Sequence, residues 1–140
     1  MSKTYEQLYK KIYKLIPTLD KLEPGDGVKL KSEGYMDLNV DVLWRDQEKT
    51  TIALSHYYRH PSGDQVPDPD MEIAIHHKLK MAEALSFQDI WGYREVYPQP
   101  GMVAPKAKQE LNSFLNQWLN NLQMQGHKLE GEEDKGKGRG

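Results

Sequence analysis

The stretch MDLNVDVLW, residues 36–44, decides the fold, because apolar and polar residues alternate along most of it. One side of the alternation consists of Met36, Leu38, Val40, Val42 and Trp44, and the other carries Asp37, Asn39 and Asp41. A period of two predicts a β-strand, since successive side chains of a strand point to opposite faces of its sheet. We therefore expect a sheet with an apolar face against the core and a polar face toward water.

The segments on both sides of this stretch predict further strands. Alternation recurs at residues 28–32, 50–59 and 71–76. Residues 80–88 also have helix propensity, but a turn at His77–Lys78 would pair them with the preceding strand, so we predict a strand there. Residues 93–97 are a candidate edge strand. Residues 60–69 contain three prolines and a glycine, which predicts a loop without regular structure.

Helical spacing of apolar residues marks each end of the chain. The first stripe is Tyr5, Leu8, Tyr9, Ile12, Leu15 and Ile16, and the second is Leu111, Phe114, Leu115, Trp118, Leu119 and Leu122. Pro17 ends the first helix, Pro105 suits the start of the second, and Gly126 favours its end. We predict an α+β fold: a single antiparallel meander sheet of about five strands, with the N-terminal and C-terminal helices packed on one face.

Length and composition narrow the class of protein. A chain of 140 residues has the usual size of one domain, which we place at residues 1–126. Residues 127–140 are mostly glycine and charged residues, which predicts a disordered polar tail. The net charge of −2 gives no long-range attraction for nucleic acid, so a nucleic-acid partner is not expected. The lack of cysteine, of a signal peptide and of a membrane span predicts a cytoplasmic protein away from the membrane.

Three stretches of the chain carry a family resemblance. They are residues 8–17, residues 71–77 running into Met81-Ala82-Glu83-Ala84, and Tyr97-Pro98 together with the final helix and its Leu111-Asn112-Ser113-Phe114-Leu115-Asn116-Gln117-Trp118-Leu119. In these stretches the chain resembles the YqiB-like proteins, a bacterial family with a domain of unknown function. Residues 103–108 lack the acidic pair that members of that family often have before the last helix. The resemblance implies a small cytoplasmic bacterial protein and supplies no catalytic residue.

Two clusters of tyrosine and arginine are the best candidates for a ligand surface. Tyr57 and Arg59 stand beside His60, and Tyr93 stands beside Arg94. Tyrosine and arginine are enriched in the hot spots of protein interfaces, and they can also stack on RNA bases. Ordinary aromatic packing on an edge strand is the alternative interpretation.

The loop after His60 adds aspartates to this candidate surface. Asp64, Asp68 and Asp70 belong to it, although turn formation alone explains aspartates in such a loop. With His56 and His60 they offer ligand types that zinc or manganese prefers, but the spacing matches no established metal-binding pattern. We therefore predict no metal, no cofactor and no catalytic residue.

The sequence favours a non-enzymatic binding or adaptor domain with an unidentified protein partner, because no catalytic constellation is visible. The second hypothesis is a metal-dependent hydrolase acting on a small phosphorylated or nucleotide substrate, and the third is an RNA-binding module. We expect the working surface on the polar sheet face and on the loop from His60 to Pro69. Trp44, Trp91 and Trp118 are expected in the core.

Overall fold

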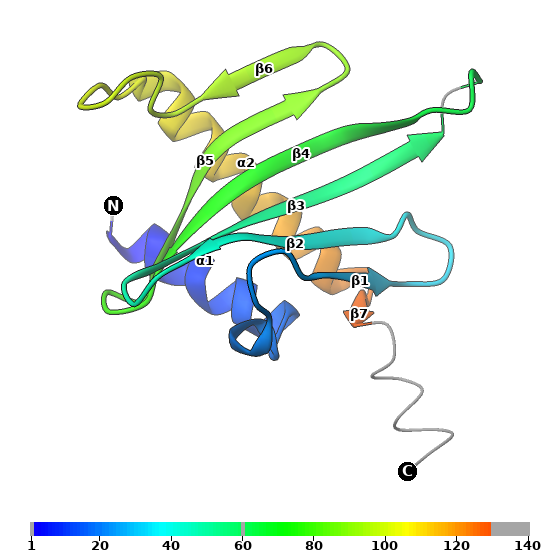
Figure 1. The fold of residues 1–140 in the computed structure, drawn as a ribbon, viewed down its shortest axis with the longest axis horizontal. Helices are drawn as coiled ribbons and strands as arrows, with labels where there is room; N and C mark the ends of the chain where they lie inside the picture. The colour runs from blue at the N-terminus through cyan, green and yellow to red at the C-terminus, as the bar shows by residue number, and fades with distance from the viewer. Residues whose placement is uncertain (1, 60, 130–140) are drawn as a thin grey trace.

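Seven antiparallel strands and two α-helices make up the fold, which a computed structural model describes for residues 2–59 and 61–129. In chain order the elements are α1 (Ser2–Leu15), the 3-10 helix η1 (Leu19–Lys21), β1 (Gly27–Lys31), β2 (Leu38–Arg45), β3 (Lys49–Arg59), β4 (Gln65–His76), β5 (Met81–Asp89), β6 (Gly92–Glu95), α2 (Pro105–Met124) and β7 (Lys128–Leu129). Across the sheet the strands follow the order β6-β5-β4-β3-β2-β1-β7 (Figure 1). The predicted α+β class and single antiparallel sheet are confirmed, and the strand predicted at residues 80–88 corresponds to β5, with Lys80 in the turn before it.

The number of strands was underestimated, since the sheet has seven rather than about five. β6 lies at one edge of the sheet and overlaps the edge strand predicted at residues 93–97. β7 went unpredicted, because a strand of two residues is too short to show alternation. Leu129 of β7 pairs with Leu30 of β1 and is only 7% exposed, so it belongs to the core.

The predicted disordered tail begins too early at residue 127. His127 is buried, and its Nε2 lies 2.9 Å from the carbonyl oxygen of Met36. Lys128 pairs with Lys31 in the sheet. Backbone partners thus hold a stretch whose composition alone would not order it. The remainder of the predicted tail, residues 130–140, lies outside the described residues.

The predicted irregular loop at residues 60–69 is also corrected, because β4 already begins at Gln65. Between the pairs Ser55–Asp70 and Tyr57–Pro67, β4 advances one residue more than β3, which is a β-bulge. β5 pairs with β4 only from Asp70 onward, so the preceding part of β4 extends beyond β5 (Figure 1). Bulges and strand edges are the places where a sheet tolerates proline.

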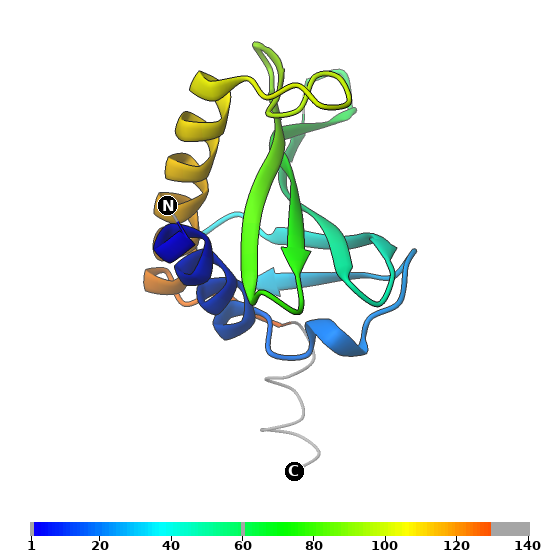
Figure 2. The same cartoon turned by 90° about the vertical axis from the view of Figure 1, so that its left-hand side faces the viewer.

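Both helices lie on the same face of the sheet, as the side view in Figure 2 shows. The strand residues beneath them are almost completely buried and include Leu38, Val40, Ile52, Leu54, Met71, Ile73 and Ile75. α1 contributes Leu8 and Ile12 to this core, and α2 contributes Leu115 and Leu119. No helix in the described ranges is long and apolar enough to span a membrane.

Asn112 holds α2 against the edge of β5. The backbone N–H of Ala84 donates to Oδ1 of Asn112 over 2.8 Å, and Nδ2 of Asn112 donates to the carbonyl oxygen of Lys108 over 2.7 Å. β6 pairs with β5 only at residues 86–89, so Ala84 lies beyond that pairing. The buried Asn112 amide therefore supplies an acceptor that a neighbouring strand would otherwise provide.

Candidate functional site

The sheet face opposite the helices is turned toward the viewer in Figure 1 and is termed the open face. Two rows of residues, each paired from strand to strand across the sheet, make up this face together with Tyr57. The first row is Lys29, Asn39, Ser55, Asp70, Gln88 and Tyr93. The second row is Gly27, Asp41, Ala53, Glu72, Ser86 and Glu95. Within residues 2–59 and 61–129, neither a helix nor a strand covers it (Figure 2). The polar sheet face expected from the sequence is therefore accessible.

Small residues form the floor of the open face. Ala53 is 8% exposed, Ser55 1% and Ser86 5%, although they lie on the side of the sheet without helices. Longer side chains on the neighbouring strands shield them, since cross-strand neighbours on one face lie within reach of each other. The side chains at the centre of the open face are therefore short, and longer side chains cover them.

Three carboxylates from β2 and β4 surround this floor. Burial raises the pKa of the Asp70 carboxyl, and the neighbouring charges of Glu72 and Asp41 raise it further. Burial also raises the pKa of Asp41. The charged form of each group is disfavoured in the folded protein, by burial at both carboxyl groups and additionally by neighbouring like charges at Asp70. The charged forms of Asp41 and Asp70 therefore disfavour the fold at neutral pH, and carboxyl groups with raised pKa values are enriched at functional sites.

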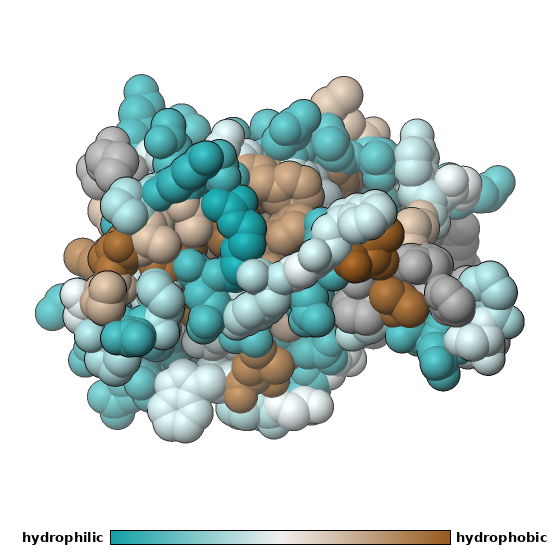
Figure 3. Space-filling view, turned by 90° about the horizontal axis from the view of Figure 1, so that it is seen from above, coloured by the Kyte–Doolittle hydropathy of each residue, from teal (hydrophilic) through white to brown (hydrophobic). Residues whose placement is uncertain are grey.

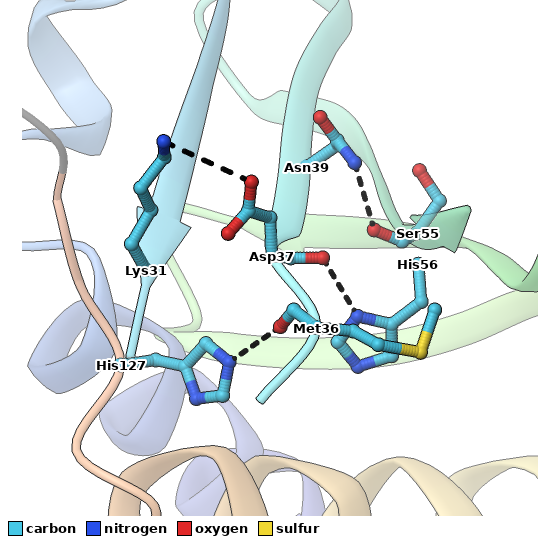
Figure 4. A network of polar contacts seen from close by, with 7 residues as sticks. All are labelled: Lys31, Met36, Asp37, Asn39, Ser55, His56 and His127. Atoms are coloured by element: carbon cyan, nitrogen blue, oxygen red, sulfur yellow. Dashed lines mark hydrogen bonds and ion pairs between the residues drawn. The ribbon is translucent and has the colours of Figure 1, made fainter. Parts of the chain in front are cut away.

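Two buried polar atoms at the centre of the open face lack hydrogen-bond partners among the described residues. They are Oγ of Ser55 and Oδ1 of Asp70, which belong to directly paired residues of β3 and β4. Figure 4 shows that the side chains of Ser55 and His56 point to opposite sides of β3, with Ser55 on the side of Asn39. Buried polar groups are almost always hydrogen-bonded, so an unsatisfied pair at one register position needs an explanation.

A shallow hollow of about 430 Å³ adjoins the cluster at the β1–β2 end of the open face. Gly27, Lys29, Asn39 and Asp41 line it. A Cβ atom at Gly27 would lie 2.6 Å from Oδ1 of Asp41, so glycine leaves the space that this carboxylate occupies. The hollow therefore lies between Asp41 of the carboxylate cluster and β1, where Lys29 is the basic residue beside it.

Three of the predicted site residues meet on the open face. Asp70 lies at its centre, Tyr93 lies at the β6 edge, and Tyr57 continues the face toward the β3–β4 hairpin. Burial raises the pKa of Tyr93, whose hydroxyl group also interacts with Ser86 and Glu95. Tyr93 is 55% exposed and Tyr57 36% exposed, so both rings are available to a partner.

The other predicted site residues are dispersed. Arg94 pairs with Phe87 on the helix side and forms a 2.8 Å ion pair with Glu110 of α2, so the predicted cluster of Tyr93 and Arg94 is divided between two faces. Asp64 is exposed in the hairpin turn, and Asp68 is half-buried in β4. The side chain of Arg59 and the whole of His60 lie outside what the structure describes.

His56 faces the helices rather than the aspartates. Its Nδ1 donates to the carbonyl oxygen of Asp37 over 2.8 Å, and its Nε2 accepts from the indole N–H of Trp118 over 3.2 Å (Figure 4 shows the first contact). Both ring nitrogens thus have partners inside the fold. Among the described residues, which exclude His60, no three acidic or histidine side chains are arranged to hold a metal ion.

Two of the tryptophans are exposed, contrary to the prediction. Trp118 is 7% exposed and belongs to the core, whereas Trp44 is 55% and Trp91 87% exposed. Trp44 follows a register shift in β2 that breaks the alternation after Val42. Trp91 lies in the tight turn between β5 and β6, where its backbone N–H donates to Oδ1 of Asp89.

Other surfaces of the protein have fewer features of a binding site than the open face. A cavity of about 570 Å³ lies between α1 and α2, lined by residues that include Tyr5, Lys108 and Asn116. Lys108 already lies over the ring of Tyr5, 5.8 Å from its centre, and Asn116 already accepts from Lys11. From above, exposed apolar residues form separate patches among hydrophilic ones (Figure 3). The open face is therefore the best candidate site.

Sequence reasoning identified Asn39 and Asp41 as polar face residues but missed Ser55. The sequence did contain an indication of this site, because Ala53 and Ser55 are small residues at alternate positions of a predicted strand. Recognising their importance required the register that places Ser55 opposite Asp70.

Residues 8–128 match the sequence profile of the domain of unknown function DUF6908, which covers most of the chain. The protein therefore belongs to the DUF6908 family. No curated protein and no solved structure matches the chain. Nothing in these comparisons connects it to the YqiB-like proteins, and that resemblance stays a prediction.

Proposed function

We propose that this DUF6908 protein is a non-enzymatic binding domain whose open face holds a segment of a partner protein. The observation that carries the proposal is the pair of buried atoms, Ser55 Oγ and Asp70 Oδ1, which lie on the side of the sheet without helices and have no hydrogen-bond partner in the described part of the chain. A partner that donates hydrogen bonds to them would remove a cost that the isolated fold bears. Two exposed tyrosines, Tyr93 at the β6 edge and Tyr57 toward the β3–β4 hairpin, supply the aromatic contacts that dominate protein interfaces.

The competing hypotheses have less support. A metal-dependent hydrolase was based on His56 and the aspartates, but His56 lies on the helix side of β3 with both ring nitrogens engaged. An RNA-binding module needs basic groups for the phosphates. The two rows of the open face carry Asp41, Asp70, Glu72 and Glu95 against Lys29 alone, so RNA would be repelled there.

A peptide-display selection tests the proposal. We expect selected peptides to bind the wild type and to lose about tenfold in affinity with Tyr57→Ala or Tyr93→Ala, the range expected for an aromatic hot spot. Tyr35→Ala is the matched control, because Tyr35 is 52% exposed and lies in the loop between β1 and β2. Selection without enrichment, or binding that ignores both open-face substitutions, would contradict the proposal.

A further inference from the structure

We infer that Ser55 and Asp70 recognise a lysine side chain of the bound protein segment; this inference rests on the proposed function of the open face. Ser55 and Asp70 are directly paired across β3 and β4, and each has a buried oxygen without a hydrogen-bond partner among the described residues. A side-chain ammonium group carries three N–H donors and no acceptor. It can therefore satisfy both oxygens at once.

Charge complementarity favours a cation at this point. Asp41 and Glu72 lie on either side of Ala53 in the adjoining row, and their charges act on Asp70. A cation placed among the three carboxylates would relieve their mutual repulsion. Hydrogen bonds to charged groups are stronger than neutral ones, so the same cation would gain most from the buried acceptors.

The shape of the floor suits the stem of a lysine. Ala53 and Ser55 have small side chains, so they leave room for a narrow methylene chain once the longer side chains that bury them turn aside on binding. Lysine side chains commonly place their methylene groups along apolar surface while the charged end seeks polar partners. Tyr93, two strands from Asp70 in the same row, offers an exposed ring with which the rest of the bound segment can pack.

Lysine fits better than arginine because of where the acceptors lie. A guanidinium group prefers the two coplanar oxygens of one carboxylate, which it binds with two parallel N–H bonds. Here the two unsatisfied oxygens belong to different side chains on adjacent strands. A compact ammonium group has no planar requirement and can donate in separate directions.

Fluorescence anisotropy with a labelled peptide of repeated Gly-Ser-Lys units tests this inference. Arginine and acetyl-lysine versions of the same peptide are the ligand controls. We expect Asp70→Asn and Ser55→Ala to weaken binding of the lysine peptide by about tenfold, the effect of losing a hydrogen bond to a charged group. Glu6→Gln and Ser113→Ala make the matching changes at exposed positions of α1 and α2 and should stay within about twofold, as exposed charges contribute little.

Amide shifts of the uniformly labelled wild type give a second readout that needs no substitution. The lysine peptide should shift the amides of residues 53–55 and 70–72 more than those of α1 and α2. Equal affinity for the lysine and acetyl-lysine peptides would overturn the inference. So would displacement of the peptide by magnesium chloride far beyond that by sodium chloride of equal ionic strength, since the site would then bind a divalent ion.

Failure of this inference is distinguishable from failure of the proposed function. If display-selected peptides bind the open face while the lysine peptide does not bind, or binds regardless of Ser55 and Asp70, only the lysine assignment is wrong. If neither kind of peptide binds at the open face, both proposals are wrong.

Discussion

The indole N–H of Trp118 donates to Nε2 of His56, with 3.2 Å between the two nitrogens, and this bond joins α2 to the helix side of β3. Because Nε2 accepts, the proton of the imidazole lies on Nδ1, which donates to the carbonyl oxygen of Asp37. Burial is the main cause that lowers the pKa of His56, against the opposing effect of the bond to Asp37. The ring is thus held in its neutral form.

We predict that the protein loses stability as the pH falls below about 6.5, the pKa of histidine in an unfolded chain. In that window the unfolded chain takes up a proton at His56 and the folded protein does not, so the free energy of unfolding decreases until the folded pKa is reached. Urea denaturation at several pH values measures this. In His56→Gln the free energy of unfolding should decrease less over this pH range, because the contribution of His56 is removed. Parallel pH profiles for the two proteins would show that His56 is not responsible.

Asp70→Asn should stabilise the fold at neutral pH. The pKa of Asp70 is raised in the folded state, so its contribution to stability is favourable at low pH and is lost as the pH rises through the folded pKa. An amide removes the charge that burial and Glu72 disfavour. Thermal unfolding should show a higher Tm for the variant at pH 7, with the difference shrinking toward pH 4, where the wild-type carboxyl group is increasingly protonated. Glu6→Gln should leave the Tm unchanged, and a lower Tm for Asp70→Asn would refute the prediction.

Asn112→Ala should destabilise the protein by about 1–3 kcal/mol, because it leaves the Ala84 N–H without its acceptor at a buried position. Hydrogen exchange at the Ala84 amide should accelerate in the variant beyond the general effect of lower stability. Asn120→Ala, at an exposed position of the same helix, is the control and should change stability little. An unchanged exchange rate at Ala84 would mean that the contact does not protect the edge of β5.

Arg45→Lys should cost about 1–3 kcal/mol, although it preserves the charge. The guanidinium group donates to the carbonyl oxygens of Leu19 and Leu22 and to Oγ1 of Thr50, which ties the segment around η1 to the sheet. A lysine ammonium group cannot reproduce this spread of donors. Chemical denaturation should separate Arg45→Lys from Arg94→Lys, since Arg94 is an exposed member of one ion pair. Equal stability of these two variants would speak against the bridging role.

Local periodicity made most of the fold predictable. Alternation at residues 36–44 and the helical stripes of the two ends correspond to β2, α1 and α2, because each of these patterns is repeated several times. β7 has only two residues, so it shows no alternation of apolar and polar residues. The first part of β4 was predicted as a loop because of its prolines, which the sheet accommodates beside a β-bulge. Trp44 was misplaced because a register shift in β2 interrupts the period.

The candidate site was less predictable, since it depends on which strands become neighbours. Asp70 was selected as part of an aspartate-rich loop, whereas its significance lies in its pairing with Ser55. Tyr93 and Arg94 are adjacent in sequence and were expected to act together. The pleat of the strand sends them to opposite faces, so only Tyr93 reaches the open face.

The pairing of Leu30 with Leu129 joins residues that are separated by about three quarters of the described chain. During translation, β1 therefore cannot pair with β7 until the last described residues have been synthesised. The helix-facing side of the central strands also remains without α2 until late in translation, because α2 is synthesised after all of these strands. Contacts between such distant residues slow folding and prolong the exposure of apolar surface. Until α2 has been synthesised, the nascent chain therefore exposes the apolar side of the central strands.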